Sequence, residues 1–272
     1  MQEMNLQEIQ QASLVVLKHI HQMCEKHGLR YCVFYGTLIG AIRHKGFIPW
    51  DDDVDIAMER KDYDRFLDIM KKNEGDDNPF YVDHFSTKKD YPHYIMRICD
   101  KRYTIEFENT KHRSGVFVDV YPLDDTGGDL DYWKNQVVNV DHLKKCMTLC
   151  TYKSVLYGNS LAHKLGNIPL LVYSRIKGIA YFMHKIDDLA QQFNGSESGY
   201  IGVPSWERFP SQLKQEWMEE FVLVPFEDTQ VYVPKEYDKV LRAKYGDYMK
   251  MPPEDQCVPH HNYSAFKKAL VY

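Results

Sequence analysis

The chain has 272 residues, of which 44% are hydrophobic and 27% are charged, a balance typical of a globular protein with a sizeable core. Its formal net charge of −5 excludes a dedicated nucleic-acid binder, because such proteins usually carry a basic face. Six cysteines without metal-finger spacing predict reduced thiols, no apolar run is long enough to cross a membrane, and the N-terminus shows no secretory signal. We therefore expect a cytoplasmic protein with no transmembrane span and no nucleic-acid partner.

The first predicted element is an amphipathic helix over residues 6–27, where apolar residues recur at helical spacing until Gly28. A short strand over residues 30–35 is predicted to deliver the chain to Gly36 and Thr37. There a glycine permits close approach of the backbone to a ligand, and the following hydroxyl can bond a phosphate oxygen. We therefore predict a phosphate-binding turn at this position.

A helix is predicted to begin at residues 38–43, and its first N–H groups favour an anion. Three cationic side chains follow directly, namely Arg43, His44 and Lys45. Two interpretations of them stay open. They hold a substrate phosphate, or they are solvated and offset the charge of the aspartates that come next.

Four carboxylates gather within five residues, at Asp51, Asp52, Asp53 and Asp55. Each close pair repels by about 4 kcal/mol at an effective dielectric of about 20, so a fold that gathers them needs a cation. Alternation along a strand would place Asp51, Asp53 and Asp55 on one face. Oxygen ligands suit Mg²⁺ or Mn²⁺, ions that commonly share their ligands with substrate phosphates, and a solvated acidic turn is the alternative.

The middle of the chain predicts a helix with Asp62 as its N-cap residue, followed by short strands separated by polar turns. These strands are expected over residues 80–85, 94–99 and 103–107, which is consistent with a mixed sheet extended by hairpins. No repeat or clean linker divides this region.

One carboxylate, Asp119, lies in the middle of an apolar strand predicted over residues 115–122. Burying a carboxylate is costly unless it is paired or binds a metal. We therefore predict Asp119 as a third carboxylate of the site, either as a metal ligand or as the general base. A solvent-exposed position at the strand end is the alternative.

Two helical regions are predicted next, over residues 130–157 and 160–193. The apolar side of the second region consists of Ile176, Ile179, Met183 and Ile186, and the basic residues near it are Arg175, Lys177 and Lys185. This pattern predicts either an ordinary helix that faces the core or one that rests on a membrane surface.

The last part of the chain is strand-like and interrupted by prolines over residues 200–234, with regular alternation at 229–233. A short helix is predicted over residues 236–245. The proline-rich tail after it is expected to be irregular, and it leads to His260 and His261.

Several of these segments together resemble the LicD family, which includes bacterial phosphocholine transferases and is related to the fukutin group. The resemblance rests on Tyr35 to His44, Gly46 to Asp55, Gly115 to Asp124, Tyr245 to Met249, and Pro252-Pro253. These anchors occur in the family's order from about residue 30 to about residue 260, and so the resemblance covers nearly the whole chain.

The fold that the resemblance implies is of the α+β class, a nucleotidyltransferase-like mixed sheet flanked by helices, with a helical insertion and a C-terminal extension. We expect a single catalytic domain over residues 1–272. Its parts are a core at about 28–125, the helical region at about 130–193 and a C-terminal part at about 200–272 that completes the site.

The activity that the resemblance implies is metal-dependent transfer of phosphocholine, or a similar phospho-alcohol, from CDP-choline or a related CDP-alcohol. The acceptor is a sugar hydroxyl of a cell-surface glycan such as teichoic acid or lipopolysaccharide. A lipid-linked acceptor and contact with the inner face of the membrane belong to this expectation. The alternatives are nucleotidyl transfer, use of CDP-ribitol or CDP-glycerol, and a nucleotide-binding scaffold whose site is degenerate.

The resemblance implies roles for Gly36, Thr37, Asp53, Asp55 and Asp119, and the chemistry of the other candidate residues fits the same reaction. The catalytic and metal-binding residues, for Mg²⁺ or Mn²⁺, are Asp53, Asp55 and Asp119, with Asp51 as a further candidate ligand. Phosphate or nucleotide is expected at Gly36, Thr37, Arg43, His44, Lys45 and Arg97. The candidate aromatic pocket for choline or the base consists of Tyr35, Trp50 and Tyr121, because aromatic rings attract a quaternary ammonium. The C-terminal candidates are Tyr248, His260 and His261.

Overall fold

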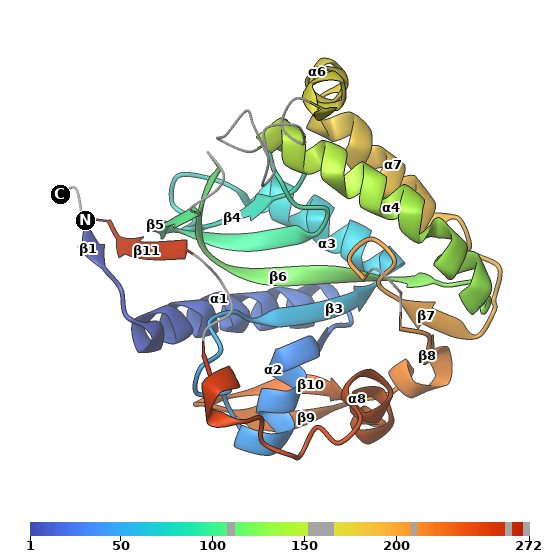
Figure 1. The fold of residues 1–272 in the computed structure, drawn as a ribbon. Helices are drawn as coiled ribbons and strands as arrows, with labels where there is room; N and C mark the ends of the chain where they lie inside the picture. Colours follow the sequence, from blue (N-terminus) through green and yellow to red (C-terminus); the bar gives the residue numbers. More distant parts are fainter. Residues whose placement is uncertain (108–111, 152–165, 208–210, 259–262, 269–272) are drawn as a thin grey trace.

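A computed structural model describes residues 1–107, 112–151, 166–207, 211–258 and 263–268. Within these ranges the chain forms a mixed sheet of nine strands, a separate two-stranded hairpin, and helices that flank the sheet. In Figure 1 helices α3, α4 and α7 lie above the long strands, while α1, α2, α8 and the hairpin lie below them. The expected α+β class with a mixed sheet is confirmed, whereas the expected division into a core and two further parts stays a prediction.

The elements of the described residues have the following bounds. The strands of the sheet are β1 (Gln2–Glu3), β2 (Cys32–Val33), β3 (Asp55–Glu59), β4 (Phe80–Asp83), β5 (Met96–Phe107), β6 (Arg113–Asp125), β7 (Tyr200–Gly202), β8 (Leu213–Lys214) and β11 (Tyr263–Lys267). The hairpin strands are β9 (Phe221–Phe226) and β10 (Thr229–Pro234). The helices are α1 (Leu6–His27), α2 (Tyr35–Ile39), α3 (Arg60–Asn73), α4 (Leu130–Thr151), α6 (Ile168–Lys177), α7 (Ile179–Gln191) and α8 (Tyr237–Tyr245), with a π-helical turn η1 (Gly40–His44) and 3₁₀ turns η2 (Gln215–Met218) and η3 (Glu254–Gln256).

The predicted first helix is confirmed as α1, and its ends show why. The side chain of Asn5 accepts a hydrogen bond from the N–H of Glu8, whose own side chain accepts one from the N–H of Asn5. Gly28 ends the helix in the left-handed conformation at φ 60°, which a glycine adopts without strain. Leu17 and Ile20 on its inner face are fully buried, so the helix packs on the core.

The centre of the sheet is β6, whose residues from Ser114 to Asp124 are all buried. It pairs with β5 in the antiparallel direction and with β3 in the parallel direction, and so the predicted apolar strand is confirmed. A side chain at Gly115 would collide with the backbone carbonyl of Asp100 on β5, which explains the glycine. Strands β3 and β6 are the pair on which the candidate site is built.

The prediction of two strands over residues 94–99 and 103–107 is wrong, because β5 is a single strand that spans most of both. Its pairing with β6 shifts register between Asp100 and Ile105. Charged residues at this bulge broke the apolar pattern in the sequence, and Arg102 folds back there to bond the carboxylate of Asp100 at 2.6 Å. The cap predicted at Asp62 is also wrong, because α3 begins earlier, with Glu59 as its N-cap residue.

The second helical region also differs from its prediction. It contains two helices, α6 and α7, separated at Gly178, which has φ 76°. Ile179, Met183 and Ile186 are buried as expected, but Ile176 belongs to α6 and is 78% exposed. The helical period continues through Gly178 in the sequence, so the change of direction was invisible there. Residues 152–157 and 160–165 of the two predicted regions lie outside the described residues.

The C-terminal part contains one confirmed helix, α8, which ends at Gly246, and one strand that the sequence did not predict. Strand β11 pairs with β5 and places Tyr263 opposite Phe107. It also pairs with β1, so the two ends of the described chain lie side by side (Figure 1). A strand of five residues has too little sequence pattern to be predicted, and only its pairing with β1 and β5 identifies it.

A pH dependence of stability follows from His84, which is buried just after β4. Burial, and then the positive charges of Lys71 and Arg60, lower the pKa of His84 from 6.5 to about 3. As the pH falls below 6.5, the unfolded chain binds the proton and the folded protein does not, so the stability present above pH 6.5 is lost towards pH 3. We expect this group to cost about 2 kcal/mol of unfolding free energy between pH 7 and pH 5.

Urea denaturation at both pH values measures this effect. The variant His84→Gln should lose about 2 kcal/mol less than the wild type between the two pH values, since it has no imidazole to charge. The exposed His142, changed to glutamine, is the control. An equal pH slope in His84→Gln and wild type would contradict the prediction.

Candidate active site

Three carboxylates meet where β3 and β6 run side by side. Asp53 lies just before β3, Asp55 is its first residue, and Asp119 is the residue of β6 paired with Asp55. The N–H of Asp119 donates to the carbonyl of Val54 at 2.9 Å, which fixes this register. One oxygen of each carboxylate lies within 4.8 Å of the other two. The structure therefore brings together the three residues that were predicted to share a site.

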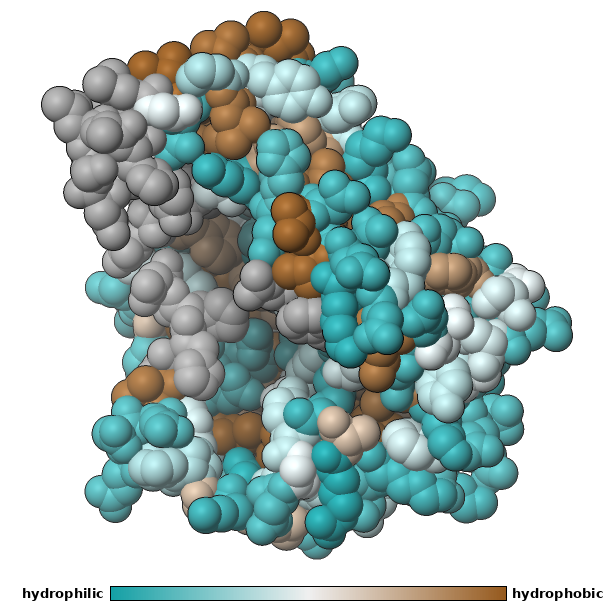
Figure 2. Space-filling model, turned by 45° about the vertical axis from the view of Figure 1, so that its right-hand side comes forward, coloured by the Kyte–Doolittle hydropathy of each residue, from teal (hydrophilic) through white to brown (hydrophobic). Residues whose placement is uncertain are grey.

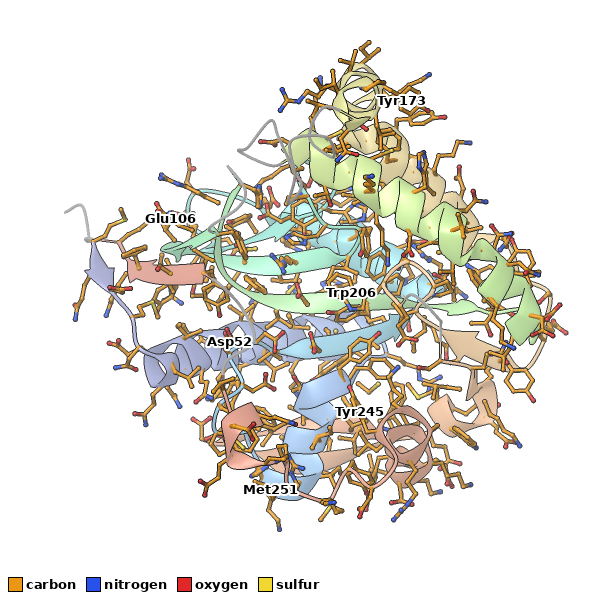
Figure 3. The ribbon with its side chains drawn as sticks, viewed as in Figure 1. Asp52, Glu106, Tyr173, Trp206, Tyr245 and Met251 are labelled. Carbon is orange, nitrogen blue, oxygen red and sulfur yellow. The ribbon has the colours of Figure 1, made fainter. Side chains whose placement is uncertain are left out.

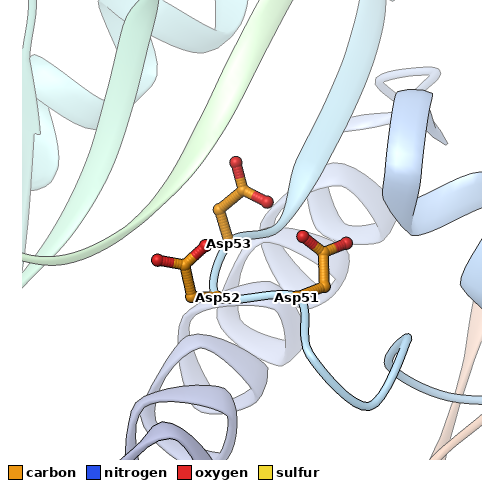
Figure 4. Close-up of side chains that lie close together, drawn as sticks. All are labelled: Asp51, Asp52 and Asp53. Atoms are coloured by element: carbon orange, nitrogen blue, oxygen red, sulfur yellow. The ribbon is translucent and has the colours of Figure 1, made fainter. Parts of the chain in front are cut away.

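The loop from Asp51 to Val54 precedes the strand, so the expected alternation along one strand is wrong for it. In Figure 4 the carboxylates of Asp51, Asp52 and Asp53 all rise from the same side of the loop. Oxygens of these three residues also lie within 4.8 Å of one another. The loop is held from outside, because Gln10 donates to the carbonyl of Asp51 and Tyr263 donates to that of Asp52, each at 2.8 Å.

Asp55 is the electrostatic centre of the cluster. It is 7% exposed, and its Oδ1 is buried without a hydrogen-bond partner among the described residues. Burial, and then the charges of Asp53, Asp119 and Asp51, raise the pKa of Asp55 well above its usual range. A cation would relieve this repulsion and satisfy the orphaned oxygen.

These residues fit a hard divalent cation. Oxygens on opposite sides of an Mg²⁺ ion are about 4 Å apart, and those of Asp53, Asp55 and Asp119 lie within 4.8 Å, so small side-chain movements suffice. Asp51 contributes to the charge at the edge of the same cluster. The cluster could bind a metal ion such as Mg²⁺ or Mn²⁺, as the sequence predicted.

Asp119 is held by Arg97 of β5. The Nε of Arg97 donates to Oδ1 at 2.6 Å and its Nη2 donates to Oδ2 at 3.3 Å. The guanidinium also contacts His93, and it lies 3.8 Å from the ring centre of Phe117. Burial lowers the pKa of Arg97, but the charge of Asp119, the neighbouring Tyr91 and the hydrogen bonds to Asp119 together raise it above its usual range. Arg97 is only 3% exposed and is engaged by Asp119, so its contact with a donor phosphate stays a prediction.

The turn at Gly36 and Thr37 serves the same carboxylates. A side chain at Gly36 would place its Cβ 2.9 Å from Oδ2 of Asp51, so glycine lets that carboxylate approach helix α2. The hydroxyl of Thr37, which is 4% exposed, accepts a hydrogen bond from the N–H of Asp55 at 2.9 Å. The turn therefore positions the acidic residues, and its role as a phosphate-binding turn stays a prediction.

Among the three cationic residues predicted to bind phosphate, Arg43 contacts the segment that follows α8. Arg43 donates to the carbonyl of Tyr248 at 2.7 Å and to Nε2 of His44 at 2.9 Å. Lys45 ends η1 in the left-handed conformation, and the hydroxyl of Tyr248 donates to Asp238. Arg43 thus fastens the segment after α8, and phosphate binding by these side chains stays a prediction.

Two of the three predicted pocket aromatics lie together next to the acidic cluster. The rings of Tyr35 and Tyr121 are 4.9 Å apart, and Trp206 follows at 5.5 Å from Tyr121. Tyr94 completes this aromatic cluster at 5.4 Å from Trp206. The third predicted residue, Trp50, lies elsewhere, with its ring edge towards His44 at 6.5 Å.

Comparison with known proteins assigns the chain to a family. Residues 28–170, more than half of the chain, match the LicD/FKTN/FKRP nucleotidyltransferase domain. The chain belongs to the LicD/FKTN/FKRP family. This confirms the resemblance that the motifs around Asp53 and Asp119 indicated.

One relative of this LicD-family chain is similar over its whole length. The lipopolysaccharide cholinephosphotransferase LicD of Haemophilus influenzae is 29% identical over 280 aligned positions, which cover 98% of this chain and 99% of that protein. An uncharacterized protein of Rickettsia typhi is 40% identical over 55 residues, 20% of this chain and 18% of its own. One of Rickettsia prowazekii is 37% identical over 59 residues, 22% of each chain.

Four residues beside the candidate site were missed by the sequence analysis, namely Trp206, Glu207, Lys244 and Tyr245. Glu207 accepts a hydrogen bond from the hydroxyl of Tyr35 at 2.8 Å and is paired with Lys244, which lies over the Tyr35 ring at 4.6 Å. Desolvation, and then the negative charge of Asp55, raise the pKa of the Tyr245 hydroxyl above its usual range. Figure 3 shows Trp206 near the centre of the molecule and Tyr245, the last residue of α8, below it. Only Tyr245 carried a local signal, since it opens one of the family motifs.

His260 and His261, the remaining C-terminal candidates, lie outside the described residues. No helix in the ranges that the structure describes combines the length and the apolar character that crossing a bilayer requires.

A side chain at Gly36 tests how the LicD-family turn supports the carboxylates. The variant Gly36→Ala should push the Asp51 carboxylate away from α2, because the added Cβ would lie 2.9 Å from it. Since displacing groups that support a metal site typically costs 10-fold to 100-fold in affinity, we expect the apparent affinity for Mg²⁺ to fall about tenfold. Isothermal titration calorimetry measures this affinity. Gly75→Ala, where the added Cβ meets nothing within 4 Å, is the control, and an unchanged affinity in Gly36→Ala would contradict the prediction.

Proposed function

We propose that this LicD-family chain transfers phosphocholine, or a closely similar phospho-alcohol, from a CDP-linked donor to a sugar hydroxyl of a cell-surface glycan. The observation that carries the proposal is the cluster of Asp53, Asp55 and Asp119, placed in a member of this family. Phosphocholine as the transferred group is supported by the similarity to the lipopolysaccharide cholinephosphotransferase LicD, which spans nearly all of both chains. The proposal keeps the expected cytoplasmic location and a lipid-linked form of the acceptor.

The proposed reaction forms one bond, breaks one bond and transfers one proton. The acceptor hydroxyl oxygen forms a bond to the phosphorus that bears choline, the bond from this phosphorus to the CMP oxygen breaks, and CMP leaves. The proton of the hydroxyl passes to a carboxylate of the cluster. Asp53, Asp55 and Asp119 would hold Mg²⁺ or Mn²⁺, which when bound neutralises charge on the diphosphate. Arg97 orients the carboxylate of Asp119 before the donor arrives, and Thr37 holds the backbone of Asp55 by accepting from its N–H.

The aromatic cluster offers a place for the trimethylammonium of choline. Lys244 already lies over Tyr35, and Lys144 lies over Tyr94 at 5.1 Å. Among the described residues no cation lies over Trp206 or Tyr121, and Trp206 is half-buried. We therefore assign the choline contact to the face of the Trp206 ring, where cation–π attraction contributes about 0.5–2 kcal/mol.

Donor competition tests the proposal. Purified protein is given CDP-choline, CDP-ribitol or CDP-glycerol with Mg²⁺ and lipopolysaccharide, and CMP is measured. We expect CMP mainly from CDP-choline. CMP from none of the three would reject the proposal, a product that retains the base would identify a nucleotidyltransferase, and preference for ribitol or glycerol would change the donor. If calorimetry also shows no Mg²⁺-dependent nucleotide binding, the degenerate scaffold becomes the better description.

The choline contact has its own test. The variant Trp206→Leu should raise KM for CDP-choline about tenfold and leave KM for CDP-glycerol unchanged, because glycerol has no cation to place on the ring. Trp217→Leu, at another half-buried tryptophan, is the control. Equal effects on both donors would show that Trp206 supports the fold rather than the choline group.

A further inference from the structure

Among the described residues, helix α6 is covered on one face by other helices. Its buried residues are Leu171 and Ser174, and the helices that it contacts are α4 and α7. Four large apolar residues of α6 are instead open to solvent, namely Ile168, Val172, Tyr173 and Ile176, which are 39%, 50%, 42% and 78% exposed. Because an α-helix turns by about 100° per residue, these four form a stripe roughly opposite the buried face.

The stripe forms one end of the molecule. Helix α6 is at the top of Figure 1, and Figure 2 shows hydrophobic residues gathered at the same end of the surface. Tyr173 lies at this end in Figure 3, whereas Trp206, beside the acidic site, lies near the middle. The stripe is therefore a surface separate from the candidate active site.

Basic residues border the stripe. On the helix, Arg175 falls beside Ile168 at one edge and Lys177 falls near Tyr173 at the other, and both are exposed. The Nζ of Lys177 lies 5.0 Å from the ring centre of Tyr181. The sequence from 142 to 186 holds seven Lys and Arg residues and no Asp or Glu, in a chain whose net charge is −5. Arg175 and Lys177 thus border the exposed apolar stripe with positive charge.

We propose that the exposed face of α6, defined by Ile168, Val172, Tyr173 and Ile176, docks on an anionic bilayer surface. The aliphatic side chains would enter the boundary of the acyl chains, the tyrosine would lie at the headgroup level, and Arg175 and Lys177 would pair with lipid phosphates. With 10 residues, α6 is about 15 Å long, half of the hydrocarbon core of about 30 Å, so it lies on the membrane and does not cross it.

The charge decides between a bilayer and a second copy of this chain. Two copies that met through this face would bring two basic surfaces together, and like charges across an interface are costly. An anionic lipid surface offers the complementary sign. The proposal does not depend on the chemistry at Asp53, Asp55 and Asp119, so its test uses binding alone.

Vesicle co-sedimentation of the full chain tests the proposal. We expect binding to vesicles of phosphatidylcholine and phosphatidylglycerol, little binding to phosphatidylcholine alone, and weaker binding at high salt. The double variant Val172→Ser and Ile176→Ser should lower the partition coefficient about tenfold or more. Arg175→Ala and Lys177→Ala should each lower it about fivefold on anionic vesicles.

Val138→Ser on α4 is the matched control, because Val138 is 78% exposed, as Ile176 is. Circular dichroism and thermal unfolding confirm that each variant is folded. No binding by the wild type, or binding that Val172→Ser and Ile176→Ser leave unchanged, would overturn the proposal. So would a dimer, seen by light scattering, that the same double variant dissociates while vesicles are not bound, since the face would then join two copies.

Discussion

Replacing Asp55 by asparagine should abolish transfer while making the metal-free protein more stable. Asparagine keeps the shape of the side chain but removes one of the three charges that would hold the cation. A metal ion supplies several kcal/mol of charge stabilisation in the transition state, so we expect kcat/KM for CMP release to fall about 1,000-fold. The gain in stability comes from removing the buried charge of Asp55, which Asp53 and Asp119 repel.

The sign of the stability change follows from the pKa of Asp55, which burial and then the charges of Asp53 and Asp119 raise well above 3.8. Between 3.8 and the raised pKa, the folded protein binds a proton that the unfolded chain has released, so the metal-free protein loses stability as the pH rises through this window. The asparagine of the variant Asp55→Asn has no such proton to lose, so the variant keeps that stability at neutral pH.

Thermal unfolding with and without Mg²⁺ measures both effects in one experiment. The wild type should be stabilised by Mg²⁺, and Asp55→Asn should start from a higher melting temperature and gain nothing from the ion. Asp68→Asn on the exposed face of α3 is the control. Full activity in Asp55→Asn, or Mg²⁺ stabilisation equal to that of the wild type, would contradict the proposed role of Asp55 as a metal ligand.

The second large effect is expected at Arg97, through stability rather than substrate binding. Arg97→Met leaves Asp119 charged, buried and without its ion-pair partner, which typically costs about 3–5 kcal/mol. Both side chains of this pair are only 3% exposed, so water offers little compensation. Urea denaturation should therefore show a large loss of unfolding free energy.

A double variant separates the ion pair from the predicted phosphate contact. Arg97→Met combined with Asp119→Asn removes both charges and should recover most of the stability, while activity stays lost. The control is Arg113→Met, whose half-exposed ion pair with Glu106 should be worth less than about 1 kcal/mol. If Arg97→Met changes only KM for the donor and leaves stability intact, Arg97 binds phosphate and does not position Asp119.

Local chemistry made several features readable from the sequence. Helix α1 was predicted from its apolar spacing and from Gly28, because a helix end needs only neighbouring residues to specify it. The crowding of Asp51, Asp52, Asp53 and Asp55 within five residues implied a cation by repulsion alone.

Asp119 could also be predicted as a site residue, since a carboxylate buried in an apolar strand needs an ion-pair partner or a metal ion. The identity of that partner could not be predicted. Arg97 lies 22 residues earlier, and only the register of β5 against β6 places it opposite Asp119. Periodicity reports which face of a strand a residue occupies, but it does not report which strand lies beside it or in what register.

The same limit explains the aromatic cluster and the surface of α6. Tyr35 and Trp206 are far apart in sequence and are brought together by the fold, so no local pattern could join them. Ile176 shares the helical period of the buried residues after it, and only the turn at Gly178 sends it to the surface.

The sequence by itself therefore determined the family through its motifs, the α+β class that this resemblance implies, and the residue types of an acidic site, because motifs and crowded charges can be read along the chain. The tertiary structure alone decided that Arg97 serves Asp119, that Thr37 serves Asp55, and that Trp206 joins the site. These assignments depend on contacts between distant segments, whose register is set by the packing of the whole sheet and not by any stretch of it.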